Sequence, residues 1–84
     1  MSGQTILVVD DEPSIVEIVT LYLQRAGYTV RSAADGHAAL RALTAEKPDL
    51  VVLDLMLPGV DGLEITRRLR AEGETPIIML TSRS

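Results

Sequence analysis

Three short, unbroken aliphatic runs, each closed at once by a polar residue, constrain this chain more than any other feature. The runs, each with the residue that closes it, are residues 6–9 with Asp10, residues 50–53 with Asp54, and residues 77–80 with Thr81. Aliphatic runs of this length without polar alternation are typical of strands that are covered on both faces of a parallel sheet. The sequence therefore predicts a sheet whose strands end in polar side chains.

The segment after Asp10 predicts a helix and then an edge strand. Pro13 suits the first helical turn, and Gly27 can supply a left-handed cap at the end of the helix. Residues 28–32 alternate in polarity, as a half-exposed strand near a sheet edge does. The apolar residues that recur at helical spacing are Ile15, Ile18, Val19, Tyr22 and Ala26.

Two further helices are predicted, one on each side of the run at residues 50–53. Asp35 can cap the first of them, and Asp61 with Glu64 can cap the second. Their apolar residues are Ala39, Leu40 and Leu43 in the first and Ile65 and Leu69 in the second. The order β-α-β-α-β-α-β predicts an α/β fold with a parallel sheet flanked by helices on both faces.

Composition excludes several classes of function. Cysteine is absent and His37 is the one histidine, which excludes disulfides and soft, sulfur-ligated metal sites. The net charge is −4, and the local basic cluster of Arg67, Arg68 and Arg70 is interpreted as a solvated helix face. We therefore expect no direct binding of nucleic acid. No signal peptide or membrane span is present, so a cytoplasmic location is expected.

The polar residues that close the aliphatic runs predict one acidic site. In open α/β sheets the functional crevice lies beyond the carboxyl ends of the strands, where Asp10, Asp11 and Asp54 would converge with Thr81. Two carboxylates about 4 Å apart repel each other by roughly 4 kcal/mol at an effective dielectric near 20. A divalent cation relieves this repulsion, and Mg²⁺ fits because it prefers a few carboxylates together with water.

Simpler interpretations remain open at this point. Asp10, Asp11 and Glu12 could merely favour the positive end of the following helix. Asp54 resists such an interpretation, because burying an unpaired carboxylate in an apolar run costs several kcal/mol. Thr81 taken alone is an ordinary strand-end residue, and His37 is expected to face solvent rather than to bind a metal.

Three motifs together resemble the response-regulator receiver domains of bacterial two-component systems. They are residues 6–12 (ILVVDDE), residues 53–59 (LDLMLPG) with the Asp61-Gly62 pair, and residues 76–81 (PIIMLT). The resemblance covers essentially all 84 residues and implies a flavodoxin-like, CheY-like sheet with strand order 2-1-3-4 in this part of the domain. Residues 57–59, 61–63 and 79–81 resemble the subfamily of winged-helix transcription regulators.

The resemblance also implies a role for each matching residue. Asp54 would accept a phosphoryl group, Asp11 would bind Mg²⁺ directly, and Asp10 would bind it largely through water. The backbone carbonyl of Met56 would be a further metal ligand, and the Thr81 hydroxyl would sense the phosphoryl group. The donor would be a sensor histidine kinase, and the phosphorylated form would switch an output domain, DNA-binding in this subfamily, that lies outside the chain. Such a domain assists its own phosphotransfer and is not a turnover enzyme.

Receiver domains resembling this chain continue past the threonine to a lysine, a switch aromatic residue, a fifth strand and two more helices. Residues 1–84 are therefore expected to form an incomplete receiver domain, without the last strand and the last two helices. Since the lysine that contacts the phosphoryl group is among the missing parts, we expect weak or absent phosphorylation of this chain and poor affinity for Mg²⁺.

Two alternative functions are weighed against this one. A Mg²⁺-dependent aspartyl phosphatase would resemble a pattern with a second aspartate two positions after the nucleophile, where this chain has Met56. An assembly unit would instead associate through the exposed edge of residues 77–80, as a homodimer or a strand-exchanged assembly.

Overall fold

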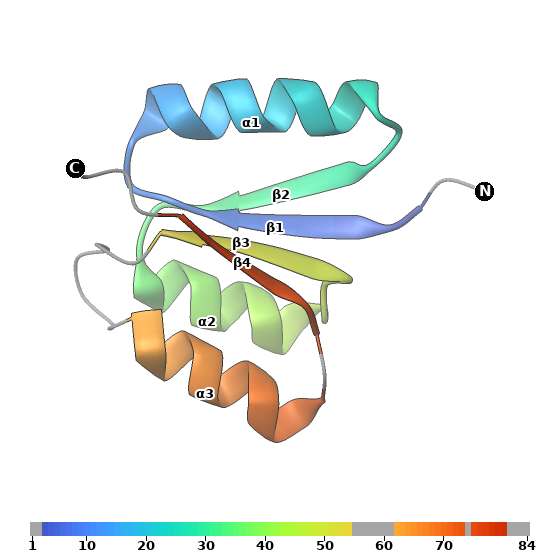
Figure 1. Cartoon of the computed structure of the whole chain (residues 1–84). Helices are drawn as coiled ribbons and strands as arrows, with labels where there is room; N and C mark the ends of the chain where they lie inside the picture. Colours follow the sequence, from blue (N-terminus) through green and yellow to red (C-terminus); the bar gives the residue numbers. More distant parts are fainter. Residues whose placement is uncertain (1–2, 55–61, 74, 81–84) are drawn as a thin grey trace.

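The computed structural model describes residues 3–54, 62–73 and 75–80, and in these the strands and helices alternate as predicted. Figure 1 shows them in chain order. They are β1 (Thr5–Val9), α1 (Pro13–Arg25), β2 (Thr29–Ala33), α2 (Gly36–Ala45), β3 (Leu50–Asp54), α3 (Gly62–Glu72) and β4 (Ile77–Leu80). None of the described helices is long and apolar enough to cross a membrane.

The four strands form one parallel sheet in the order β2-β1-β3-β4. All five residues of β1 are buried, and so are the last four of β3, which confirms that these aliphatic runs form strands covered on both faces. β2 lies at one edge and exposes most of its side chains, as its alternating pattern predicted. The strand order that the family resemblance implied is therefore confirmed for these four strands.

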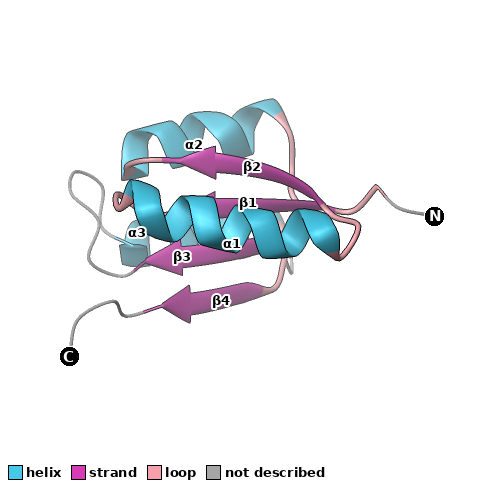
Figure 2. Cartoon of the chain, turned by 90° about the horizontal axis from the view of Figure 1, so that it is seen from above, coloured by secondary structure: helices cyan, strands magenta, loops and turns pink. Residues whose placement is uncertain are grey.

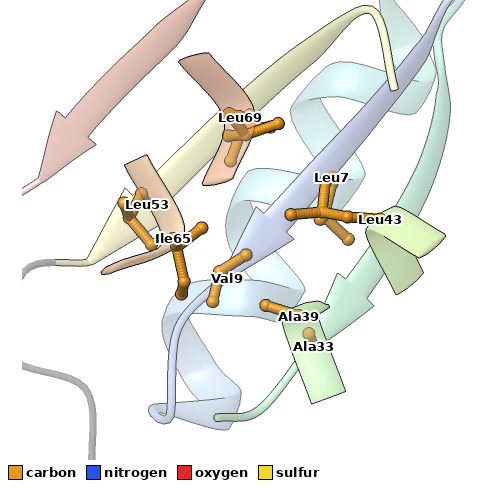
Figure 3. Close-up of a cluster of buried hydrophobic side chains, with 9 residues drawn as sticks. Leu7, Val9, Ala33, Ala39, Leu43, Leu53, Ile65 and Leu69 are labelled. Atoms are coloured by element: carbon orange, nitrogen blue, oxygen red, sulfur yellow. The ribbon is translucent and has the colours of Figure 1, made fainter. Parts of the chain in front are cut away.

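Helices cover both faces of the sheet, with α1 on one face and α2 and α3 on the other (Figure 1, Figure 2). The larger core lies on the α2 and α3 face, and most of its side chains are drawn in Figure 3. Its buried members are Leu7, Val9, Ala33, Ala39, Leu43, Val51, Leu53, Ile65 and Leu69. On the α1 face the buried residues are Ile6, Val8 and Val52. Alternate residues of each central strand thus face opposite layers.

The helix boundaries follow the capping residues of the sequence. Pro13 occupies the first turn of α1, and Gly27 follows this helix with a φ of +100°, a value that favours glycine. The Asp35 side chain accepts a hydrogen bond from the Ala38 N–H at 2.8 Å and so caps α2. The proposed capping residue Asp61 lies outside the described residues.

The side of α1 that packs on the sheet is only partly buried, and it differs from the one that the spacing indicated. Val16, Val19 and Leu23 pack against the sheet, whereas Ile18 and Tyr22 are 53% and 66% exposed. Apolar residues lie on nearly every side of this helix between positions 15 and 23, so periodicity alone does not select one face. The sheet selects it, because Val16, Val19 and Leu23 project onto Ile6 and Val8.

The arginine cluster of α3 is exposed, as expected, and has local structural roles. Arg67 pairs with Glu64 one turn earlier at 3.0 Å. Arg70 donates a hydrogen bond to the backbone carbonyl of Thr75 at 2.7 Å, which ties the end of α3 to the segment before β4. These contacts support the interpretation of the cluster as a solvated helix face.

Candidate metal centre

The register of the two central strands brings three aspartates together at the carboxyl rim of the sheet. Val9 lies level with Leu53, so Asp10, the next residue, comes to the same rim as Asp54, the last residue of β3. Asp11 follows directly. Each of the three aspartates offers a carboxylate oxygen, and these oxygens all lie within 4.8 Å of one another. The predicted convergence of Asp10, Asp11 and Asp54 is confirmed.

Asp10 is fixed in place by its backbone and by one of its carboxylate oxygens. Its N–H donates to the carbonyl oxygen of Ala33 at 3.1 Å, and its Oδ1 accepts a hydrogen bond from the Glu12 N–H at 2.9 Å. The residue is 1% exposed, and its buried Oδ2 has no hydrogen-bond partner among the described residues. A buried carboxylate oxygen without a donor is costly, and a bound cation would remove that cost.

The surroundings of Asp10 disfavour its charged form. Burial raises the pKa of the Asp10 carboxyl above its usual value, and the nearby charges of Asp54 and Asp11 raise it further. The hydrogen bond from the Glu12 N–H lowers the pKa and partly opposes these effects. The described residues around Asp10 therefore do not fully offset the negative charge that surrounds it.

The described geometry gives no support for helix capping as the role of the acidic tripeptide. Glu12 occupies the N-cap position of α1, but its side chain makes no capping hydrogen bond, and the first turn of the helix contains no acidic residue. The Asp10 carboxylate accepts its hydrogen bond from Glu12, outside the helix. Asp10 and Asp11 are thus better explained by the cluster than by capping.

The three carboxylates combine buried and accessible positions. Asp54 is 1% exposed, like Asp10, whereas Asp11 is exposed. Oxygen donors of this kind, without histidine or cysteine, suit a hard divalent cation such as Mg²⁺, which keeps several water ligands. The donor atoms, their spacing and the unpartnered Asp10 oxygen all fit that ion.

Other residues singled out in the sequence lie elsewhere. Met56 and Thr81 are outside the described residues. His37 is exposed on α2 and is not among the clustered residues, as expected. The sequence did not indicate the contribution of Ala33, whose backbone carbonyl anchors Asp10. A backbone contact between parallel strands leaves no signature in residue type.

Fold and site together define a class: an open parallel α/β domain with a cluster of carboxylates at the carboxyl ends of its central strands. Comparison with known families then identifies the family within this class. Residues 6–84 match the response regulator receiver domain, and the chain belongs to this family. It is therefore a receiver domain of the two-component response regulators, which are signalling proteins.

Characterised relatives match the chain over nearly its whole length. It is 48% identical over 81 residues to the DNA-binding response regulator MtrA of Mycolicibacterium smegmatis, covering 96% of this chain and 36% of that protein. It is 52% identical over 82 residues to the alkaline phosphatase synthesis transcriptional regulatory protein PhoP of Bacillus subtilis, covering 96% of this chain and 34% of that protein. The chain thus spans about a third of the length of these relatives.

A solved structure supports the same assignment. The response regulator TrrA of Thermotoga maritima, in complex with Mg²⁺-BeF, superposes with a TM-score of 0.86 at 41% identity, covering 96% of this chain and 71% of that one. TrrA has also been solved in complex with the histidine kinase ThkA.

Proposed function

We propose that Asp54 accepts a phosphoryl group from a sensor histidine kinase in a Mg²⁺-dependent reaction. The observation that carries this proposal is the position of Asp54: a buried carboxylate at the end of a central strand, with oxygens of Asp10 and Asp11 within 4.8 Å of its own. The chain belongs to the response regulator receiver family, and the relative TrrA has been solved in complex with Mg²⁺-BeF, which supports the same role.

Each clustered aspartate has a distinct proposed task. Asp11 is exposed and would hold Mg²⁺ directly, while Asp10 would hold it largely through water. The Met56 backbone carbonyl would complete the protein ligands, and the Thr81 hydroxyl would hydrogen-bond a phosphoryl oxygen after transfer. When bound, the ion would neutralise charge on the phosphoryl oxygens and on the carboxylates.

In the proposed phosphoryl transfer, the protein contributes mainly by positioning the reacting groups. A carboxylate oxygen of Asp54 would attack the phosphorus in line with the bond to the histidine nitrogen, forming an acyl phosphate as the phosphorus–nitrogen bond breaks. The short distances among the three aspartates, fixed by β1 and β3, would supply most of the catalysis through positioning. Thr81 would then turn towards the phosphoryl group and bias a two-state loop.

We propose the partners of this chain from the partners and functions that are named for its relatives. The complex of TrrA with ThkA supports a histidine kinase as the donor. MtrA and PhoP are named as a DNA-binding regulator and a transcriptional regulator, which supports a DNA-binding output domain in the protein to which this chain belongs. We expect this signalling to occur in the cytoplasm.

An aspartyl phosphatase is the weaker alternative. It would turn over external phosphate esters and would use a second acid two positions after Asp54, where the chain has Met56. We propose instead that the domain catalyses only its own phosphorylation. The absence of turnover on small phosphate esters, together with an acyl phosphate on Asp54, would separate the two functions.

The decisive experiment compares beryllofluoride binding and acetyl-phosphate labelling, both with Mg²⁺, between the wild-type chain, Asp54→Asn and Asp35→Asn. Asp35 is a matched control because asparagine caps a helix about as well as aspartate does. We expect a weak response from the wild type and from Asp35→Asn, and none from Asp54→Asn. Equal responses in all three proteins would remove Asp54 from its proposed role.

A further inference from the structure

A hollow of about 200 Å³ lies at the end of the sheet opposite the aspartate cluster, where α1 ends and β1 and β3 begin (Figure 1). It is lined by Gln4, Ile6, Leu23, Tyr28, Asp49 and Leu50. None of these residues belongs to the aspartate cluster. The volume is below the range of about 300 to 1,000 Å³ that is usual for ligand pockets. The hollow therefore suits a small group rather than a large ligand.

The buried part of this lining is apolar. Ile6 is 2% exposed, and Leu23 and Leu50 pack against the same small core on the α1 face of the sheet. Tyr28 is 37% exposed and adds an aromatic ring to the lining. These side chains offer an alkyl chain a surface away from water, where its burial is favourable. An occupant of the hollow should therefore carry a short apolar stem.

Asp49 places a carboxylate at the exposed part of the hollow. Its Oδ2 accepts a hydrogen bond from the Thr5 N–H at 2.7 Å, and its own N–H donates to the Thr5 carbonyl oxygen at 2.8 Å, so the carboxylate is held in place. The other oxygen, Oδ1, accepts no hydrogen bond from the residues that the structure describes, and none of those residues forms an ion pair with Asp49. A fixed carboxylate with one open oxygen is complementary to a cationic donor.

We propose that this hollow binds an alkylammonium group, the end of a linear aliphatic amine, with its N–H groups donating to Oδ1 of Asp49. The alkyl chain would lie on Leu23 and Leu50, and the Tyr28 ring would add an attraction for the cation. A guanidinium fits less well, because Oδ2 already accepts the Thr5 N–H and is less open to a pair of parallel hydrogen bonds. The site lies at the other end of the strands from Asp54 and takes no part in the proposed phosphoryl transfer.

The test is a titration of the isotope-labelled chain with n-butylammonium chloride at constant ionic strength, followed by NMR. The control ligand is 1-butanol, because it has nearly the same shape without the charge. We expect the amide signals of Leu23, Tyr28, Asp49 and Leu50 to shift with a Kd on the order of 10 mM for butylammonium, and to respond more weakly to butanol. Equal responses to the two compounds would overturn the proposal.

Two variants assign the effect to the hollow. Asp49→Asn keeps an acceptor for Thr5 but removes the charge, and should weaken butylammonium binding by about two- to fivefold, as expected for one partly solvated ion pair. Tyr28→Leu leaves the contact between Thr5 and Asp49 intact and should weaken binding to a similar extent through loss of the ring, by about two- to fivefold. Asp35→Asn makes the same change of charge at the cap of α2 and should bind as the wild type does. Unchanged affinity in both Asp49→Asn and Tyr28→Leu would contradict the proposed site.

Two further ligands distinguish the sources of such a group. A free aliphatic polyamine is represented by 1,4-diaminobutane, and the lysine side chain of another protein is represented by N-acetyl-lysine amide. Tighter binding of the diamine would assign the site to free polyamines, and tighter binding of the lysine derivative would assign it to a protein side chain. If neither compound shifts the signals of Asp49 and Leu50, the proposal is wrong.

Saturating Mg²⁺ separates this site from the aspartate cluster. At matched ionic strength, Mg²⁺ should leave the affinity for butylammonium unchanged, because the cluster lies at the opposite end of β1 and β3. Competition between the two cations would place the ammonium at the cluster and overturn the proposal.

Discussion

Thr5 and Asp49 hold each other through two hydrogen bonds at the amino-terminal end of the sheet. The Thr5 N–H donates to Oδ2 of Asp49 at 2.7 Å, and the Asp49 N–H donates to the carbonyl oxygen of Thr5 at 2.8 Å. From this point β1 and β3 run in parallel register up to the pair Val9 and Leu53. The contact at one end of the strands therefore helps to align the aspartates at the other end.

Replacing Asp49 by alanine should lower the free energy of unfolding by about 1 kcal/mol, because the Thr5 N–H loses its acceptor. In a domain of this size, that corresponds to a decrease in Tm of about 4 to 8 °C. Asp49→Asn keeps an acceptor oxygen and should retain most of the stability. Thermal unfolding followed by circular dichroism measures both variants, and a Tm of Asp49→Ala equal to that of the wild type would contradict this account.

Replacing Asp10 by asparagine should stabilise the metal-free domain at neutral pH. The pKa of Asp10 is raised in the folded state, so the folded state binds more protons than the unfolded state between the two pKa values. Stability is therefore lost as pH rises from about 3.8 through the raised value, and Asp10→Asn avoids this loss. The gain should be about 1 kcal/mol or more at pH 7, because a poorly paired buried group is neutralised.

Denaturant unfolding without Mg²⁺ at a series of pH values tests the Asp10 prediction. The difference between Asp10→Asn and the wild type should shrink as the pH falls towards 4. A difference that is constant with pH would mean that the variant acts through packing and not through charge.

Mg²⁺ should stabilise the wild-type domain against unfolding, since an ion that binds only the folded state shifts the equilibrium towards it. The gain is about 2.7 kcal/mol at a Mg²⁺ concentration one hundred times the Kd. Asp11→Asn and Asp54→Asn should each lose most of this gain, while Asp35→Asn should keep it. Calorimetry with Mg²⁺, and with NaCl at matched ionic strength, measures the effect. The same gain in every variant, or with NaCl, would place the ion elsewhere.

Most of the fold could be predicted because its signals are local. The aliphatic runs of β1 and β3, the cap at Asp35 and the glycine at position 27 each act through their own residues or near neighbours. The convergence of the three aspartates was also predictable, because strand order and direction place the ends of neighbouring parallel strands at one rim. The convergence of the aspartates could therefore be predicted without knowledge of any side-chain contact.

The features that the sequence did not reveal depend on contacts between elements. The sheet-facing side of α1 is decided by where the helix lies on the sheet, and so Ile18 and Tyr22 are exposed despite their apolar character. The hollow beside Asp49 likewise forms only when the end of α1 packs next to the start of β3. Neither feature has a periodicity or a motif of its own.

The β4 edge supports a last prediction, on self-association of this chain. Ile78 lies level with Val52 and so shares the α1 face, whereas Met79 lies level with Leu53 on the opposite face. The two side chains are 50% and 43% exposed. A helix packed on one face could not cover both, but a strand added at the edge could. We therefore expect weak association that depends on concentration, since a four-residue strand buries little area.

Ile78→Lys should abolish this association with little effect on Tm, because the side chain is half exposed and a lysine at a sheet edge disfavours further pairing. Thr29→Lys on the polar β2 edge is the matched control and should associate as the wild type does. Light scattering across a dilution series compares the three proteins. If the wild-type chain unfolds cooperatively and stays monomeric at every concentration, β4 does not pair with a second copy. The exposed apolar edge would then be stable in water.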